Sequence, residues 1–443
     1  MKLYVVLSFL FTMLAHGQVV NEDFKLLPLT GSVSAHFGSA VAIDQGVIAV
    51  GKPGDDTLGE NVGSVYLFDS RTGEQIKVIL PELGEDEWGF GYRLAMGDGV
   101  LAVGSYAVQP DGARFNSVTL YDSLSGELLF KLVPGDTESV LYLGVDIAIE
   151  NNIVVIGAGG DDVVGTASGA VYLFDISAGQ LLHRLVPEDG KRNDYFGRSV
   201  AIDHGIVAVG ATGVDDHGAG SGAAYLFDAS TGDQIAKVVP DQVEEEDWFG
   251  HSIAIQDDLL VVGANGDDFV RLNSGAVYLY EVSSGLQVAK VHPSKPSQFG
   301  RFGWDVAIDH DRIVVAADFA FNNVLYAGAV YLLDVQSGSE VSRLLPSDRQ
   351  RDDHFGSALA FSDGVVVVGA EDDDDQGDGS GSAYVFHLCP ADFNRDGILD
   401  FFDLSIFIHA FMAGELLADV NLDGQYDFFD VIVIVSEFQL GCP

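Results

Sequence analysis

Short apolar segments separated by tight polar turns fill the chain from residue 24 to residue 387. They are four to six residues long and rich in Val, Ile, Tyr and Phe, and turns such as Asp-x-Gly and Thr-Gly separate them. One representative stretch has such segments at 199–202, 206–209, 223–227 and 234–239. No helical periodicity runs through them, so the pattern predicts four short strands in an antiparallel β-meander.

The four-strand pattern returns seven times at a constant interval of 53 residues. Each unit begins with a landmark pair, aromatic or aliphatic residue plus glycine. The pairs are Phe37-Gly38, Phe90-Gly91, Leu143-Gly144, Phe196-Gly197, Phe249-Gly250, Phe302-Gly303 and Phe355-Gly356. A fixed period of this length indicates an array of one repeated unit, and seven four-stranded units predict an all-β, seven-bladed β-propeller. An open solenoid is the rival arrangement.

The two ends of the array complement each other. Residues 24–28 match a fourth strand that lacks its first three strands, because Pro28 is in phase with the prolines that close the other fourth strands. The last unit stops after its third strand, at 382–387. We expect the N-terminal strand to pair into the last unit and close the ring, which removes the exposed edges of an open array.

Two repeated residue types suit such a ring. An alanine stands in the first strand of every unit, where the innermost strands of a propeller crowd around the axis. A tyrosine stands in the third strand of six units, with Thr119 in the second unit. The tyrosines are Tyr66, Tyr172, Tyr225, Tyr278, Tyr331 and Tyr384. Their position favours packing between blades with the hydroxyl at a wetter edge. An aromatic platform for sugars is the alternative.

Closure would give the ring a face of tight turns and a face of long loops. The long loops join the second strand to the third, and five of them carry neighbouring acids. These are Asp55-Asp56, Asp161-Asp162, Asp215-Asp216, Asp267-Asp268 and Asp372–Asp375. We expect binding to take place on this acidic, loop-rich face. A solvated acidic rim is the alternative.

The charge balance narrows the range of partners. Among the 443 residues, 22 Lys and Arg stand against 67 Asp and Glu, a formal net charge of −45. A chain this acidic offers no basic patch to neutralise phosphates, which argues against nucleic acid and anionic membrane surfaces.

The first 17 residues have the features of an export signal. Lys2 precedes an apolar run at 3–14, and Ala15-His16-Gly17 supplies the small residues that a signal peptidase tests. The run is too short to span a bilayer. We therefore expect cleavage before Gln18, bacterial-type export and a secreted or cell-surface protein without a membrane span.

The repeat itself resembles a known family. The segments FG-x-S-V-A-I-D, V-V-G-A and S-G-A-V-Y-L-F, recurring in register, resemble the FG-GAP repeat of integrin α-chains and many bacterial secreted proteins. The resemblance implies a propeller that binds proteins or glycans, commonly in adhesion. Calcium-binding FG-GAP blades carry a D-x-D-x-D-G type loop between their first two strands. Here that connection is a bare turn, as at 43–47, so we expect no calcium there.

A second pattern occurs twice after Cys389. In each copy, oxygen side chains fall at positions 1, 3, 5, 9 and 12, glycine stands at 6, and position 7 lends a carbonyl. This spacing wraps the backbone around one calcium ion. We therefore predict two calcium ions. Their ligands would be Asp392, Asn394, Asp396, Ile398, Asp400 and Asp403 for the first, and Asp419, Asn421, Asp423, Gln425, Asp427 and Asp430 for the second.

The rest of the tail suggests a small helical domain. Short apolar helices are predicted at 404–412 and 431–438, one after each loop. The only two cysteines, Cys389 and Cys442, bracket the segment and predict one disulfide in an exported protein, with two free thiols as the alternative. The predicted organisation is a signal peptide at 1–17, a propeller at 18–388 and a calcium-binding domain at 389–443.

The tail resembles the dockerin module, in its GC-type form. The resemblance rests on the duplicated loops with Asp at position 12, each followed by an apolar helix, and on the flanking Cys-Pro and Gly-Cys-Pro. It implies a cohesin-like or surface-sorting partner. In dockerins, loop positions 10 and 11 help choose that partner, and here they are Phe401, Phe402, Phe428 and Phe429. Packing of these rings on a neighbouring helix or blade is the alternative.

The sequence therefore favours a secreted, non-catalytic binding or adhesion protein, anchored to a surface or scaffold by its calcium-binding tail. A propeller-type carbohydrate-active enzyme, a hydrolase or lyase, is the alternative. We predict no catalytic and no cofactor-binding residue, because similar acids recur over many blades whereas catalysis needs one unique constellation. Four residues break the repeat near the axis and are candidates for a ligand site or for the lining of its entrance: Tyr92, Arg198, His251 and Trp304.

Overall fold

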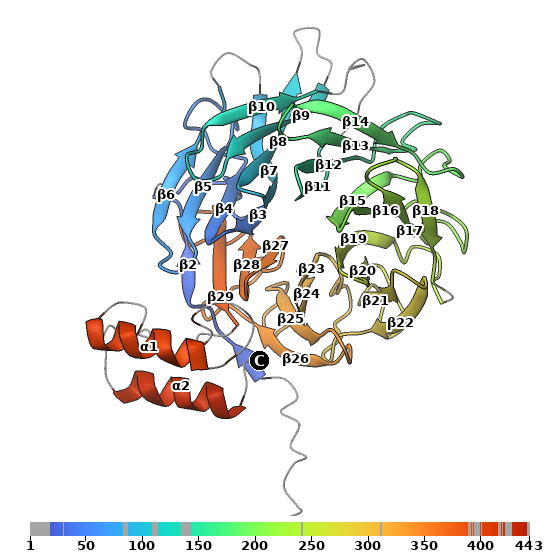
Figure 1. The fold of residues 1–443 in the computed structure, drawn as a ribbon. Helices are drawn as coiled ribbons and strands as arrows, with labels where there is room; N and C mark the ends of the chain where they lie inside the picture. The colour runs from blue at the N-terminus through green and yellow to red at the C-terminus, as the bar shows by residue number, and fades with distance from the viewer. Residues whose placement is uncertain are drawn as a thin grey trace, which may run out of the picture.

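The computed structural model describes most of the propeller and part of the tail. It covers residues 18–29, 31–82, 87–108, 114–133, 143–240, 242–310, 312–388, 391, 393, 399, 401–414, 418, 420 and 428–440. The described residues form seven β-sheets around a central axis and two helices beside the ring (Figure 1).

The first four sheets are antiparallel meanders in chain order. Blade 1 consists of β3 (Val41–Asp44), β4 (Val47–Lys52), β5 (Ser64–Asp69) and β6 (Gln75–Ile79). Blade 2 consists of β7 (Glu87–Gly97), β8 (Val100–Val108), β9 (Arg114–Asp122) and β10 (Leu128–Leu132). Blade 3 consists of β11 (Ile147–Glu150), β12 (Ile153–Ala158), β13 (Ala170–Asp175) and β14 (Gln180–Leu185). Blade 4 consists of β15 (Phe196–Asp203), β16 (Ile206–Ala211), β17 (Ala223–Asp228) and β18 (Gln234–Val238).

The last three sheets continue the series, and two of them also take strands from the N-terminus. Blade 5 consists of β19 (Phe249–Gln256), β20 (Leu259–Ala264), β21 (Ala276–Glu281) and β22 (Leu286–Val291). Blade 6 consists of β23 (Val306–Asp309), β24 (Arg312–Ala317), β25 (Ala329–Asp334) and β26 (Glu340–Leu344), with β1 (Gln18–Val20) added in parallel. Blade 7 consists of β27 (Leu359–Ser362), β28 (Val365–Ala370), β29 (Ser382–His387) and β2 (Phe24–Leu26).

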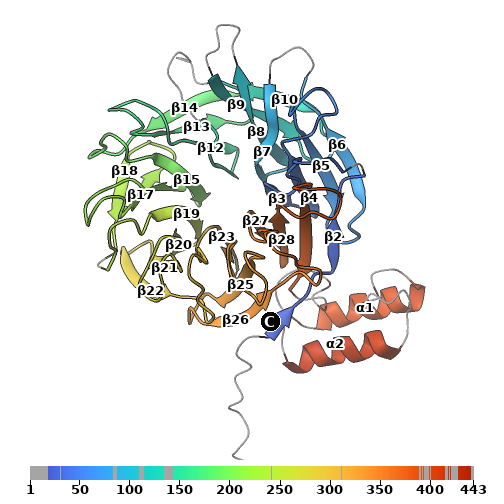
Figure 2. The same ribbon diagram turned by 180° about the vertical axis from the view of Figure 1, so that it is seen from behind.

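The prediction of an all-β, seven-bladed propeller is confirmed. The first strand of each blade is innermost, and the blades follow one another around the axis in both face-on views (Figures 1 and 2). The apolar core lies between neighbouring blades. For example, Phe37 and Ile48 of blade 1 share a buried cluster with Val367 and Val385 of blade 7.

The N-terminal segment contacts two blades. β2 pairs antiparallel with β29, with Phe24 opposite Val385 and Leu26 opposite Ala383. Leu26 is 2% exposed within the cluster that blades 7 and 1 share. The parallel pairing of β1 with β26 was not predicted from the sequence, because it breaks the four-strand period that the rest of the ring obeys.

The landmark pairs join successive blades through the backbone. The N–H of Phe196 donates to Ser168 O of the preceding blade at 3.1 Å, and its ring meets the edge of Tyr225 at 5.5 Å between centroids. Gly197 has a φ of +90°, and a Cβ there would lie 2.6 Å from Ala170 O. Glycine is therefore required by both conformation and space. The six repeated tyrosines are buried, as the packing interpretation predicted.

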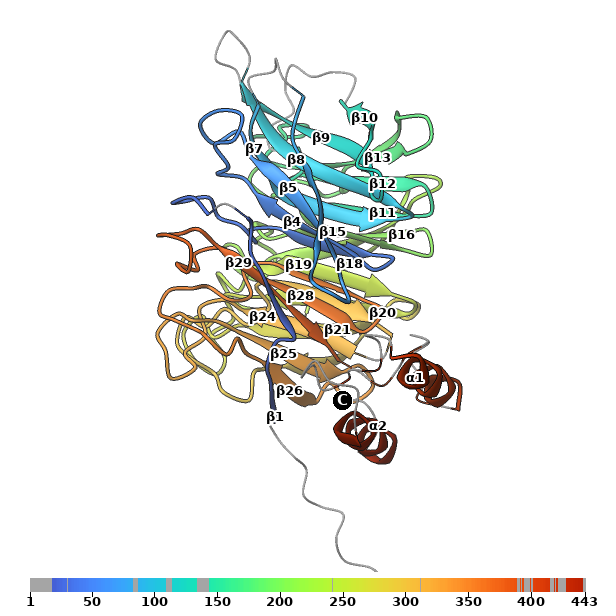
Figure 3. The ribbon, with the colours of Figure 1, turned by 90° about the vertical axis from the view of Figure 1, so that its left-hand side faces the viewer.

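The tail contains α1 (Phe401–Ala413) and α2 (Phe428–Leu440), both longer than predicted. Gly414, with a φ of +66°, ends α1 in the left-handed conformation common after helices. Phe407 and Ala410 of α1 pack against Ile434 of α2 in a small cluster of their own. Figure 3 shows the helices on the tight-turn side of the ring, where Leu388 N donates to Gly364 O at 2.9 Å.

Candidate functional site

In four of the acidic loops, one acid is buried and bonded within its own blade. Asp55, Asp161, Asp267 and Asp373 are each at most 3% exposed. Each accepts a hydrogen bond from the hydroxyl of the third-strand tyrosine. The four O–O distances, in that order, are 3.3, 2.5, 3.2 and 2.8 Å. These carboxylates therefore stabilise the loops from inside and do not face a ligand.

A cation from the fourth strand completes this arrangement. In blade 7, Lys25 Nζ contacts carboxylates of Asp348, Asp373 and Asp375 at 2.7, 2.9 and 2.5 Å. Burial alone would lower the pKa of Lys25, but these three hydrogen bonds raise it above its ordinary value. The three carboxylates are close enough to hold a metal ion, and the lysine ammonium already occupies the position between them.

In blade 1 the cation beside the buried carboxylate comes from another strand. The position equivalent to Lys25 is Val78, and the cation comes instead from Lys52 in β4. Lys52 is 1% exposed, with Nζ 3.3 Å from Asp55 Oδ2 and 5.9 Å from the ring centroid of Tyr66. Blades 1 and 7 therefore both place a lysine beside the buried carboxylate, but the lysine comes from different strands.

The acid directly after residue 55, 161, 214, 267 or 373 shapes its loop. Its carboxylate accepts a backbone N–H five residues later, in five different blades. The acceptors are Asp56, Asp162, Asp215, Asp268 and Asp374, and the donors are Asn61, Ala167, Gly220, Asn273 and Gly379. In the last blade, Asp372 also accepts from His354 Nδ1 at 2.6 Å, and the hydrogen bonds of His354 and His36 hold its pKa well below the ordinary value. The acidic loops are therefore largely committed to internal bonds.

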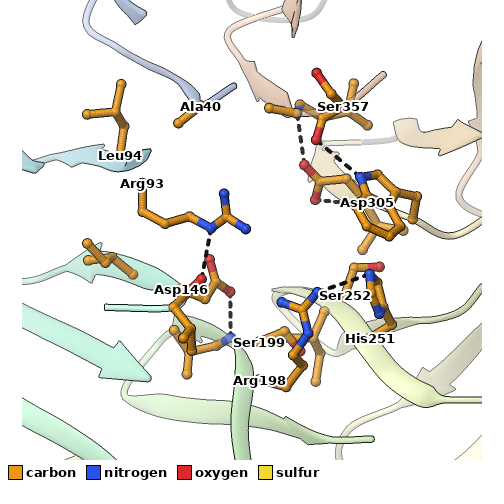
Figure 4. A pocket seen from close by; sticks show the side chains of 18 of the residues that line it. Ala40, Arg93, Leu94, Asp146, Arg198, Ser199, His251, Ser252, Asp305 and Ser357 are labelled. Carbon is orange, nitrogen blue, oxygen red and sulfur yellow. Dashed lines mark hydrogen bonds between the residues drawn. The ribbon is translucent and has the colours of Figure 1, made fainter. Parts of the chain in front are cut away.

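The axis of the ring holds a different kind of site. The innermost ends of the blades surround a cavity of about 220 Å³, and the guanidiniums of Arg93 and Arg198 point into it (Figure 4). Three successive residues after the landmark glycine line it in every unit except the second, where Tyr92 does not. The third residue is Val, Leu or Ile in every unit, whereas the first and second change from unit to unit. We call this cavity the axial chamber.

The changing positions carry the chemistry of the chamber. The first position is serine in two units, Ser39 and Ser357, but is Arg198, His251 or Trp304 in three others. The second position is alanine or serine in four units. In the remaining three it is Arg93, Asp146 or Asp305. Charged and aromatic side chains thus replace small ones in selected blades only.

The two arginines have few partners. Arg93 Nε donates to Val145 O at 2.8 Å, and its Nη1 donates to Tyr92 O at 3.0 Å. Arg198 Nη2 donates to His251 Nε2 at 3.3 Å. Within the described part of the chain neither guanidinium forms an ion pair with a carboxylate. Burial and the nearby arginines hold the pKa of His251 well below its ordinary value, so His251 is neutral and can accept.

The two acids of the chamber hold the next blade. Asp146 Oδ2 accepts from Val200 N at 2.7 Å, and Asp305 Oδ2 accepts from Leu359 N at 2.8 Å. Burial raises the pKa of both carboxyls, that of Asp305 to about 7. Asp305 therefore keeps its proton for part of the time near neutral pH, so the chamber is less negative than its composition implies.

Trp304 forms a fixed wall. Its Nε1 donates to Ser357 O at 3.2 Å, and its ring lies 4.7 Å from the ring of His251. The guanidinium of Arg301 covers it at 4.0 Å and pairs with Asp318, whose pKa burial raises to about 6. Both contacts restrict the indole, so it contributes shape and an apolar edge.

The sequence identified part of this site. Arg198, His251 and Trp304 do line the chamber, but Tyr92 is buried beside it and donates to Gly144 O at 2.6 Å. Arg93, Asp146 and Asp305 were missed. They stand one residue beyond the position that was compared, and a comparison of that next position across the seven units would have found them.

The tail residues are only partly described. Asp403 and Asp430 are 0% exposed and lie in the first turns of α1 and α2, and Val420 N donates to Asp430 Oδ1 at 2.9 Å. The other ten predicted calcium ligands and both cysteines lie outside the described residues: Asp392, Asn394, Asp396, Ile398, Asp400, Asp419, Asn421, Asp423, Gln425, Asp427, Cys389 and Cys442.

The predicted partner-binding phenylalanines are exposed where they are described. Phe401 is 74% exposed, Phe402 65% and Phe428 70%. The side chain of Phe429 lies outside the described residues. Each described ring therefore has most of its surface exposed. The part of the chain that the structure covers contains no helix long and apolar enough to cross a membrane.

The fold and the chamber define a seven-bladed β-propeller whose equivalent positions diverge around the axis. The FG-GAP repeat model matches the chain at residues 20–68, 129–174, 181–227, 233–280, 286–333 and 339–386. The chain belongs to the FG-GAP repeat family. The matches leave out residues 69–128, which include the longer strands of blade 2 and the Thr119 that replaces its tyrosine. No curated protein matches the chain.

Proposed function

We propose that the protein is a secreted, non-catalytic binding protein that engages a glycan or protein ligand at the axial chamber. A calcium-binding tail anchors it to a surface or scaffold. The observation that carries the proposal is the divergence around the axis. The seven first positions hold six residue types, whereas the third position stays aliphatic. Packing alone would favour uniform residues at equivalent places, so the variation supports a ligand.

Binding fits the chamber better than catalysis does. Asp146 and Asp305 are both engaged by backbone N–H groups of the next blade, which gives each acid a structural role. One observation favours the enzyme alternative, a glycan hydrolase or lyase: the pKa of Asp305 is raised to about 7, as a general acid requires. Degradation of a polysaccharide that is abolished by Asp305→Ala would establish that alternative.

A screen of the mature chain, residues 18–443, tests the binding proposal. A glycan array and pull-downs with and without calcium should yield a ligand. Its binding should weaken in Trp304→Ser, which places the residue of Ser39 and Ser357 at the equivalent position. Substitution at the exposed Leu286, on the outer strand of blade 5, is the control. A ligand that binds both variants and the wild type equally would contradict a site on the axis.

The calcium proposal is supported by the two described ligands. Asp403 and Asp430 are buried carboxylates at position 12 of the two loops, where a side chain coordinates calcium in loops of this spacing. Chelation should remove the helical far-UV circular dichroism signal and leave the β signal intact. Asp403→Asn and Asp430→Asn should each weaken calcium binding, with the exposed Asp257→Asn as control. Cooperative loss of both signals on chelation would contradict a separate tail domain.

The tail also supplies a docking surface for a cohesin-like or surface-sorting partner. Three exposed phenylalanines in two neighbouring helices make an apolar surface that water alone covers poorly. Phe401→Ala with Phe402→Ala should abolish surface retention of the exported protein. Leu286→Ala, at 66% exposure, is the matched control on the propeller. Equal retention of both variants would refute the role of the rings.

We further propose that the N-terminal strand holds the ring closed. The pairing of β2 with β29 and the burial of Leu26 support this role. Deletion of residues 24–28 should lower the free energy of unfolding by about 5 kcal/mol, because it removes a buried leucine and exposes a strand edge. An unchanged melting temperature would contradict closure by this strand.

A further inference from the structure

We propose that the axial chamber binds one oxyanionic group, a carboxylate or sulfate, of a ligand about the size of a sugar acid. The group is either free or is the terminal residue of an otherwise neutral glycan. This inference rests on the proposed binding function and specifies its ligand. It follows from the arginines, the size of the chamber and the charge of the surrounding protein.

The arginines provide the recognition chemistry. The short hydrogen bonds of Arg93 go to two backbone carbonyls, and the one of Arg198 goes to a neutral imidazole. Both guanidiniums point into the same cavity, and Figure 4 shows Asp146 nearby. Guanidinium groups bind carboxylates and sulfates through paired N–H donors. The two acids of the chamber, Asp146 and Asp305, each accept a backbone N–H of the next blade, and neither forms an ion pair with Arg93 or Arg198 among the described residues, so both guanidiniums are left for one more anion.

The size of the chamber limits the ligand. A volume of about 220 Å³ is below the roughly 300 Å³ at which pockets for drug-sized molecules begin. It can admit a single ring or a short acid. Ser39 and Ser357 line the chamber from blades 1 and 7, across the axis from Arg198 in blade 4. Their hydroxyls can form hydrogen bonds with neutral parts of a ligand. The chamber is therefore built for one charged group with a polar remainder.

The charge of the whole protein excludes a polyanion. With a net charge of −45 and acidic loops around the ring, a densely charged polymer would be repelled before it reached the axis. A ligand with one negative charge has the least repulsion to overcome. The same reasoning disfavours an acidic peptide with several carboxylates.

Isothermal titration of the mature chain, residues 18–443, tests the proposal. The probes are glucuronate, glucose, inorganic sulfate, a neutral oligosaccharide ending in glucuronate, and a peptide with one glutamate. Glucuronate or sulfate should bind and glucose should not. Tighter binding of the oligosaccharide than of free glucuronate identifies a glycan as the source, and the reverse identifies a free acid. Binding of the peptide alone, or equal binding of glucose and glucuronate, would overturn the proposal.

The repeat supplies the variants. Arg198→Ser and Arg93→Ala introduce residues that already stand at equivalent positions, Ser39 and Ala40. Each should weaken the anion at least about tenfold, the effect of losing a charged hydrogen bond. Arg271→Ala, an exposed arginine outside the chamber, should bind as the wild type does.

Two further controls keep the result decisive. Circular dichroism melts show whether each variant is folded, and Arg198→Ser remains informative if Arg93→Ala unfolds, because the side-chain hydrogen bond described for Arg198 goes to the His251 ring and not to the backbone. If the screen finds a neutral ligand that both variants bind normally, the binding function stands and the oxyanion inference fails. If the wild type binds no probe and no screened ligand, both fail.

Discussion

The acidic loops and the axial chamber are built from the same repeat but use charge in opposite ways. In the loops, nearly every carboxylate has an internal partner, such as the tyrosine hydroxyl and lysine that engage Asp373. In the chamber, Arg93 and Arg198 lack a paired carboxylate among the described residues. The many loop carboxylates therefore have structural roles, whereas the two arginines of the chamber are available to a ligand.

This difference shows where a repeat protein can hold a function. A residue that recurs in most blades answers a need that every blade shares, such as the support of a loop. The cation beside the third-strand tyrosine illustrates this. In blade 1 it is Lys52 of the second strand, because Val78 stands at the position equivalent to Lys25. A residue that appears in one blade only, such as Arg198, meets no need that the blades share.

The largest expected effect is a loss of stability when a charge of the acidic loops is removed. Lys25→Met should lower the free energy of unfolding by about 3 kcal/mol, because it leaves the buried Asp373 without its counter-ion. The loss should shrink below about pH 4, where the carboxylates take up protons. Lys191→Met is the control, since its side chain is 67% exposed and lies 3.9 Å from Asp216. Equal melting temperatures for the two variants would show that the loop charges are not structural.

A smaller effect tests whether the source of the cation matters. Lys52→Ala should cost about 2 kcal/mol, and it introduces the residue that stands at this place in blade 3, Ala158. Adding Val78→Lys should recover much of the loss, because residue 78 is opposite Tyr66 in the sheet. Urea unfolding of both variants measures this. Failure of the second substitution to rescue the first would contradict an interchangeable cation.

Titration of Asp305 should affect both stability and binding. Its pKa rises from an ordinary 3.8 to about 7 in the folded chain, so the folded state holds this proton more tightly than the unfolded state. The free energy of unfolding contributed by this group therefore falls as the pH rises from about 4 to about 7. Above that range its negative charge opposes an anion in the chamber, so affinity for an anion should decrease.

Calorimetric titrations between pH 5 and pH 8, a range chosen about the Asp305 pKa, measure this dependence. His251 stays neutral throughout, and Arg198 stays charged, so neither contributes a competing titration. Asp305→Ala, which places the residue of Ala358 in the chamber, should flatten the profile. An affinity that increases with pH would indicate a cationic ligand instead.

The smallest expected effect is on the stability of the chamber variants. Arg198→Ser should change the free energy of unfolding by less than about 0.5 kcal/mol, because its described side-chain hydrogen bond is a single contact to His251. A large loss of stability would place Arg198 with the structural charges and remove the contrast.

The sequence predicted the structural features that recur with the 53-residue period. Seven units, strand order and the small first-strand residues follow from spacing alone, because each blade must satisfy the same steric demands. The pairing of β1 with β26 occurs once and leaves no periodic trace. Neither does the role of Lys52, which depends on a neighbour across the sheet. A comparison of the seven units could have singled out Arg93, Asp146 and Asp305. Only the structure shows that these three residues line one cavity.

A crystal structure of the mature chain with glucuronate tests the central claim most directly. We predict that the carboxylate lies in the axial chamber, within about 2.7–3.2 Å of guanidinium nitrogens of Arg93 and Arg198. Glucuronate bound only at the acidic loops, or an empty chamber at saturating ligand, would contradict the assignment of function to the axis.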